Sequence, residues 1–149
     1  MTVHLRRATR RGWMPGVAAL ERWTTLALGR RGRGGELSVL LVGPARSRSL
    51  NRRYRGRDRS TNVLSFPATG RPAGQRHALG DLVICPQLLR REARSQGKAV
   101  RAHWMHLVIH GTLHLIGYDH QRPAEAQRME RREARLLRSL GVADPYRSI

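Results

Sequence analysis

The chain has 149 residues, of which 29 are basic and 10 are acidic, and its formal net charge is +19 at pH 7. This length predicts a single domain over residues 1–149, and the lone cysteine excludes an internal disulfide. No segment approaches the roughly 20 apolar residues of a membrane-spanning helix, so we expect a cytoplasmic protein without a membrane partner. The positive charge favours a polyanionic partner such as nucleic acid, because phosphates are attracted to a strongly basic surface.

Strand and helix patterns are intermixed along the chain. Short runs rich in Val, Ile and Leu predict strands, and longer runs with apolar residues every three or four positions predict helices. In chain order we predict a strand at 2–8, a helix at about 17–29, a strand at 37–42, a helix at 45–55, strands at 63–66 and 82–85, and helices at 86–96, 99–116 and 123–140. Because no repeat or second domain boundary interrupts this order, we expect one compact α+β domain.

Three histidines around the end of the helix at 99–116 have the spacing of a metal site. His110 and His114 are four residues apart, so their side chains project from the same helix face. Gly117 can adopt the left-handed conformation that ends a helix, after which the chain can turn back and bring His120 beside them. Three neutral imidazoles suit zinc and leave a fourth position open for reaction. We therefore predict one Zn²⁺ per chain, held by His110, His114 and His120.

Other interpretations of these histidines stay open from the spacing alone. Histidines on a half-buried helix face are often packed rather than bound to metal, although five of the seven histidines lie between positions 103 and 120. For His103 and His106 we predict support of the ligands or packing, while either could close the metal shell. Metzincin proteases share the spacing as H-E-x-x-H-x-x-G-x-x-H, but Gly111 stands where their glutamate base would be. The pattern thus favours a substrate other than a peptide.

The segment 110–120 resembles the signature H-G-x-L-H-L-x-G-Y-D-H of the YbeY-type zinc endoribonucleases, a family of rRNA maturation factors. Segments 50–56, 61–67 and 80–84 are similar to further blocks of this family, and the match runs from about residue 37 to 146. Many members carry aspartate where this chain has Asn62. The resemblance implies a small mixed sheet packed with about five helices, with the zinc site at one end of a groove.

The same resemblance implies the function and the partners. The expected activity is hydrolysis of RNA phosphodiester bonds in 16S rRNA 3′-end maturation and late ribosome quality control. A groove lined by arginines and a few aromatics favours single-stranded RNA. The expected partners are ribosomal RNA, the small ribosomal subunit and its assembly factors. Apart from the resemblance, we expect the protein to be a monomer. Zinc would lower the pKa of a bound water from about 15.7 to about 7, which supplies a nucleophile at neutral pH.

Candidate catalytic and RNA-binding residues surround these motifs. Arg55 lies where the resembling family has a functional arginine, and its guanidinium can grip a phosphate with two parallel bonds. Asp119, beside a predicted ligand, is expected to orient an imidazole or to act as a base. The arginines near Arg55 are predicted to bind RNA: Arg52, Arg53, Arg57 and Arg59.

Two alternatives to a ribonuclease are retained. One is a non-catalytic RNA-binding ribosome assembly factor in which zinc is structural, although structural zinc sites normally have four protein ligands. The other is a metzincin-like metalloprotease, which would have to work without the base that Gly111 replaces. A test of RNA cleavage separates both from the predicted enzyme.

Overall fold

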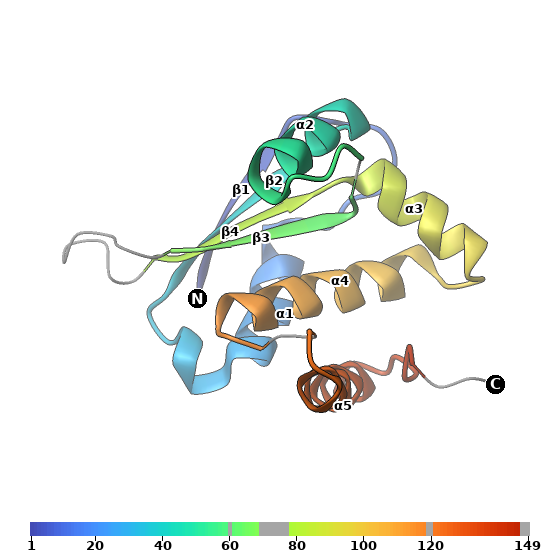
Figure 1. Cartoon of the computed structure of the whole chain (residues 1–149). Coiled ribbons are helices and arrows are strands. Elements are labelled where there is room, and N and C mark those ends of the chain that lie inside the picture. Colours follow the sequence, from blue (N-terminus) through green and yellow to red (C-terminus); the bar gives the residue numbers. More distant parts are fainter. Residues whose placement is uncertain (60, 69–77, 119–120, 147–149) are drawn as a thin grey trace.

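The structure is a computed structural model that describes residues 1–59, 61–68, 78–118 and 121–146. A four-stranded sheet runs through it in the order β1-β2-β4-β3, as seen in Figure 1. Parallel pairs join β1 to β2 and β2 to β4, whereas β3 is antiparallel to β4. The strands span Thr2–Arg7 (β1), Glu36–Leu41 (β2), Val63–Pro67 (β3) and Ala78–Ile84 (β4). The expected small mixed sheet is therefore confirmed.

Helices cover both faces of this sheet. In Figure 1, α2 lies on one face, α1 and α4 lie on the other, and α5 packs beyond α4. The helices span Val17–Leu28 (α1), Pro44–Arg55 (α2), Pro86–Ser95 (α3), Val100–Leu115 (α4) and Pro123–Ser139 (α5), and a short 3₁₀ helix, η1, spans Gly29–Gly32. Together they form a single small α+β domain with five α-helices in the described part of the chain.

Local sequence explains where several helices begin and end. Pro44, Pro86 and Pro123 each open a helix, where the missing N–H of proline would have no helical partner and its fixed φ suits the first turn. After α2, Gly56 adopts a left-handed conformation with φ 68° and its N–H donates to the carbonyl oxygen of Arg52. Among the predicted elements, β4 has the bounds that differ most from the prediction. The strand begins at Ala78, four residues before the apolar run at 82–85 from which it was predicted.

The main core lies between the sheet and the helices α1, α4 and α5. Trp23 of α1, Trp104 of α4 and Leu137 of α5 are each fully buried in it. A second, smaller core around Val42, Leu64 and Val83 lies on the other face of the sheet, with Leu50 of α2 packed against it. Because α4 is packed between the sheet on one side and α1 and α5 on others, its histidines are held by several elements at once.

Gly111 allows α4 to approach the sheet closely. A Cβ atom at this position would lie 2.9 Å from Cδ2 of Leu82, 3.2 Å from Oγ of Ser65 and 3.3 Å from Cγ2 of Val63. The hydroxyl of Ser65 donates a hydrogen bond to the carbonyl oxygen of Gly111 at 3.1 Å. The position that distinguishes this motif from a metzincin is thus a contact point between α4 and β3.

Within the described ranges, no helix combines the length and the apolar character needed to cross a bilayer.

Candidate metal centre and nucleic-acid groove

His110 and His114 direct their ring nitrogens toward each other from α4. Their Nε2 atoms are 3.1 Å apart, and their ring centroids are 4.7 Å apart. Both side chains line a groove of about 740 Å³ between α4 and β3. The helical spacing that pairs these two histidines in sequence therefore also pairs them in space.

The separation of the two nitrogens fits a shared metal ion. Zinc lies about 2.0–2.1 Å from each imidazole nitrogen, so two ligands of a tetrahedral site are about 3.3 Å apart. The observed 3.1 Å between Nε2 of His110 and Nε2 of His114 is close to that value. These two side chains could hold the ion without changing their backbone positions.

The chain turns after α4 as the sequence predicts, up to Tyr118. Gly117 has φ 100° and its N–H donates to the carbonyl oxygen of His114 at 3.1 Å. The N–H of Tyr118 donates to the carbonyl oxygen of Leu113 at 3.1 Å, which closes the end of the helix. The predicted ligand His120 and the predicted catalytic residue Asp119 lie outside the described residues.

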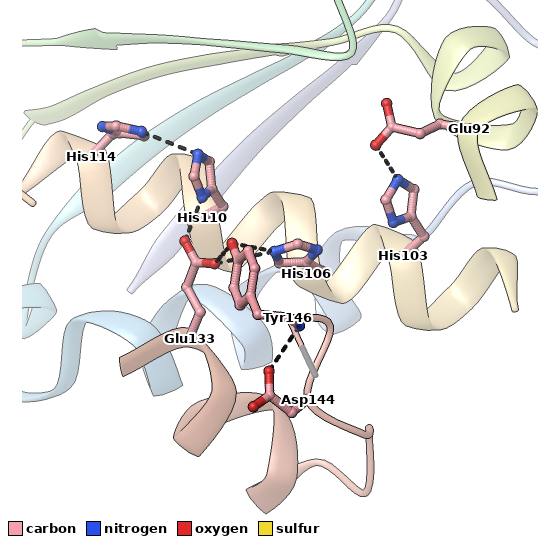
Figure 2. Close-up of polar contacts among 8 residues, drawn as sticks. All are labelled: Glu92, His103, His106, His110, His114, Glu133, Asp144 and Tyr146. Atoms are coloured by element: carbon pink, nitrogen blue, oxygen red, sulfur yellow. Dashed lines mark hydrogen bonds and ion pairs between the residues drawn. The ribbon is translucent and has the colours of Figure 1, made fainter. Parts of the chain in front are cut away.

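Glu133 of α5 contacts two histidines of α4, His106 and His110 (Figure 2). It is fully buried, and its two carboxylate oxygens contact Nδ1 of His110 and, at 3.1 Å, Nε2 of His106. The ligand atoms of His106, His110 and Glu133 all lie within 4.8 Å of one another, so this group could also hold a metal ion. A metal site on α4 is thus possible on either side of the His110 ring.

Hydrogen bonds keep the buried Glu133 carboxylate ionised. Burial alone raises its pKa, but hydrogen bonds from His106, His110 and Tyr146 outweigh burial and hold the pKa of Glu133 at about 2. Burial and the adjacent Glu133 carboxylate raise the pKa of Tyr146. The phenol therefore stays protonated and donates a hydrogen bond to Glu133.

His103 lies on another part of α4 and turns away from His110 and His114 (Figure 2). Its Nε2 pairs with Oε1 of Glu92 in α3 at 2.8 Å, and the residue is almost fully buried. The other oxygen of Glu92 accepts a hydrogen bond from Nδ2 of Asn62 at 2.7 Å. An aspartate in place of Asn62 would face Glu92 as a like charge, so the amide of Asn62 suits its partner in this chain.

The predicted catalytic arginine, Arg55, and the predicted RNA-binding arginines occupy two different places. Arg55, Arg57 and Arg59 line the same groove as His110 and His114, and Nη2 of Arg55 donates to the carbonyl oxygen of Ser65 at 2.8 Å. Arg52 and Arg53 are exposed on α2, and neither is among the described residues that line the groove. The Arg53 guanidinium instead lies 5.5 Å from the centre of the Tyr54 ring.

Comparison with known proteins assigns the family. The profile of the family described as "Endoribonuclease YbeY" matches residues 18–141. This chain belongs to the endoribonuclease YbeY family. An Endoribonuclease YbeY of Halorhodospira halophila is 51% identical over 135 residues, covering 89% of this chain and 88% of the relative. Another of Pseudomonas entomophila is 53% identical over 133 residues, covering 89% of this chain and 85% of the relative.

A solved structure supports the fold of this YbeY family member. The solution structure of a Thermotoga maritima protein aligns with a TM-score of 0.57 at 24% sequence identity, covering 98% of this chain and 99% of that one. The resemblance that the motifs indicate is thus confirmed for the family by the sequence relatives and for the fold by this structure.

The sequence patterns did not single out Glu133 and Tyr146, which the structure of this YbeY family member places in contact with the histidines of α4. The sequence does contain a signal for Glu133, because it lies on the buried face of α5. Met129 is four residues before it, and Leu136 and Leu137 are three and four residues after it. An acidic residue in an apolar stripe must find a partner when it is buried. No comparable pattern marks Tyr146, which follows α5 and is 41% exposed.

Proposed function

We propose that this chain is a zinc-dependent, single-strand-specific endoribonuclease that hydrolyses RNA phosphodiester bonds. The observation that carries the proposal is the His110–His114 pair at the wall of a groove that also presents Arg55, Arg57 and Arg59. Relatives about half identical over most of the chain bear the name Endoribonuclease YbeY. The substrate we assign is the 3′ end of 16S rRNA, cut during maturation and late ribosome quality control in the cytoplasm.

The proposed ligands are His110, His114 and His120, with one zinc ion per chain. Nε2 of His110 faces Nε2 of His114, whereas Nδ1 of His110 is already in direct contact with Glu133. An ion between His110 and Glu133 would have to push Nδ1 of His110 and Oε1 of Glu133 apart. An ion between Nε2 of His110 and Nε2 of His114 would leave that contact in place. Zinc bound there supplies a Lewis acid and lowers the pKa of water from about 15.7 to about 7.

The arginines of the groove bind the substrate backbone in this proposal. The guanidinium of Arg55 is held at the edge of β3 by the Ser65 carbonyl, and its remaining N–H groups can grip a phosphate and neutralise the charge that develops on it. Arg57 and Arg59 add two more positive charges to the lining of the groove. Arg52 and Arg53 on α2 would contact RNA beyond the groove. Asp119 is assigned to orienting a ligand imidazole.

The structure argues against a metzincin mechanism for this groove. A glutamate at position 111 would point its side chain into Leu82, Val63 and Ser65, where a Cβ atom alone is already crowded. A metal held by the proposed ligands would supply the activation that a glutamate base provides in a metzincin.

The test is cleavage of a single-stranded RNA that carries the 3′ end of 16S rRNA. Purified wild-type protein loaded with zinc should cut it, and chelator-treated protein and a His114→Ala variant should not. A matched control is His4→Ala, which removes an exposed imidazole from β1 and should leave cutting unchanged. Tight RNA binding without cutting by fully loaded protein would instead support a non-catalytic assembly factor, and cutting of peptides alone would support a protease.

The proposal extends to assembly state and partners. We assign a monomer over residues 1–149 that acts as a single domain on ribosomal RNA within the small subunit. Cleavage by the isolated protein would show that no ribosomal protein is required for chemistry. Cleavage that appears only after small subunits or assembly factors are added would show that the substrate is presented by them.

A further inference from the structure

The Glu133 carboxylate is buried completely between α4 and α5 and makes contacts from both oxygens. Oε1 contacts Nδ1 of His110, and Oε2 contacts the hydroxyl of Tyr146 and, at 3.1 Å, Nε2 of His106. Burying an isolated carboxylate costs several kcal/mol. Removing it from this position would take away the Oε1 atom that Nδ1 of His110 contacts, whereas Nε2 of His106 and the hydroxyl of Tyr146 would still lie 3.0 Å from each other.

The contacts determine where the proton of His110 resides. An ionised carboxylate only accepts hydrogen bonds, so Nδ1 of His110 must be the donor. In the neutral ring Nε2 then carries the lone pair. That lone pair is on the side of the ring that faces Nε2 of His114, 3.1 Å away. The tautomer that Glu133 selects is therefore the one that a metal ligand in the groove requires.

We infer that Glu133 is a positioning residue of the metal centre, which fixes the tautomer and the ring orientation of His110 from behind. Carboxylates that accept the second N–H of a ligand imidazole also make the ligand more basic, and their loss typically weakens metal binding 10- to 100-fold. The inference rests on the ligand set proposed above and does not depend on RNA cleavage.

Two further side chains hold the carboxylate. His106 donates from the preceding turn of α4, and Tyr146 donates from the segment that follows α5. The N–H of Tyr146 donates to Oδ1 of Asp144 at 2.9 Å, which shapes the turn that brings the phenol back to Glu133. In the described part of the chain, α5 and the segment up to Tyr146 thus form one side of the metal centre, although none of their residues supplies a ligand in this assignment.

The first experiment reads the tautomer directly in the wild-type protein. Nitrogen-15 NMR of the imidazoles, without metal and with zinc, distinguishes a proton on Nδ1 from one on Nε2. We expect the Nδ1–H form of His110 in both states. A predominant Nε2–H form in the metal-free protein would overturn the inference, and this measurement does not depend on any variant folding.

The second experiment measures zinc affinity by competition with a chelating dye. Glu133→Gln should bind zinc 10- to 100-fold more weakly than the wild type and should lose the Nδ1–H preference of His110. The matched control is Glu130→Gln, which removes the same charge one turn earlier on α5, and no hydrogen bond joins Glu130 to a histidine in the described parts of the chain. Equal zinc affinities of the two variants would overturn the inference.

Tyr146→Phe covers the case in which Glu133→Gln does not fold. It removes one donor to Glu133 and leaves the ring of a half-exposed residue in place, and we expect zinc binding about fivefold weaker. Wild-type affinity in Tyr146→Phe together with an unfolded Glu133→Gln would show that Glu133 serves the fold rather than the metal. A wild-type protein that binds no zinc would overturn the ligand set itself, whereas one that binds zinc without cutting RNA would leave the inference intact.

Discussion

The hydroxyl of Ser65 in β3 donates a hydrogen bond to the carbonyl oxygen of Gly111 in α4 at 3.1 Å. This contact joins the edge strand to the central helix directly beside His110. The same two elements form the walls of the groove, so the width of the groove depends on how closely α4 approaches β3. Gly111 is the residue that permits this approach, because a Cβ atom there would crowd Leu82.

Gly111→Glu should therefore destabilise the fold rather than create a protease. A side chain would be forced between α4 and the sheet, and overpacking of this kind costs about 1–3 kcal/mol before the buried charge is counted. Urea unfolding should show a lower midpoint for this variant. Gly16→Ala is a suitable control, because no atom lies within 4 Å of a Cβ built at Gly16. Wild-type stability of Gly111→Glu, combined with peptide cleavage, would contradict the packing role.

Zinc should stabilise the wild-type protein against heat, because a ligand that binds only the folded state adds free energy of unfolding. At a free zinc concentration of 100 times its dissociation constant, the gain is about 2.7 kcal/mol. The melting temperature should be higher with zinc than with chelator, both for the wild type and for His4→Ala. The His114→Ala variant should melt at the same temperature in both and should keep its fold. A zinc-dependent shift that survives in His114→Ala but disappears in His106→Ala would place the ion beside Glu133 instead.

Arg55→Ala should spare metal binding and lower RNA cleavage by about 10²-fold. The reason is that removal of one charge-stabilising donor commonly costs this much in rate, while no zinc ligand is touched. Single-turnover cleavage at saturating enzyme isolates this effect from binding. Arg135→Ala removes an equal charge from an exposed position on α5 and serves as the reference. Normal cutting by Arg55→Ala would remove this arginine from the mechanism.

Arg57 and Arg59 should contribute to binding mainly through phosphate contacts. Each contact to a single strand adds about 0.7 to the slope of log affinity against log salt concentration. Binding titrations at several salt concentrations should therefore give slopes reduced by about 0.7 for Arg57→Ala and for Arg59→Ala. The same measurement on Arg52→Ala and Arg53→Ala reports how far RNA extends over α2. Unchanged slopes for all four variants would show that RNA takes another path.

Acidification should destabilise the protein through His103. Burial lowers the pKa of this imidazole below its ordinary value, although Glu92 opposes the shift, and His106 and Lys98 contribute to lowering the pKa. The folded state then prefers the neutral ring, so stability is complete above the unfolded value and falls as the pH drops below about 6.5. One proton contributes at most about 1.4 kcal/mol per pH unit.

Chemical unfolding of the metal-free protein between pH 8 and pH 5 measures this dependence. His103→Gln should show a shallower loss of stability than the wild type over the acidic half of that range. His4→Gln, which removes an exposed imidazole, should follow the wild type. Parallel curves for His103→Gln and the wild type would mean that this histidine is not the group that titrates.

Much of the architecture is determined by local sequence. The apolar periodicity of α1 and α5, the prolines that open α2, α3 and α5, and the glycines that follow α2 and α4 all act over a few residues, and the predicted elements are found. The pairing of His110 with His114 is equally local, because residues four apart on a helix share a face. The motifs that surround them were enough to identify the family that the relatives confirm.

Tertiary structure decided what surrounds these two histidines. Glu133 is 23 residues from His110 in sequence, and Tyr146 is 40 residues from His106, so only the packing of α5 against α4 brings them together. The packing of α4 on β3 also shows that Gly111 is a contact point between the two elements. In the sequence, Gly111 is notable only because it replaces the glutamate base of the metzincin motif. Likewise, the turn after α2 separates Arg57 and Arg59 in the groove from Arg52 and Arg53 on the helix. Contacts between distant segments depend on how whole elements pack, and a pattern read along the chain contains no such distances.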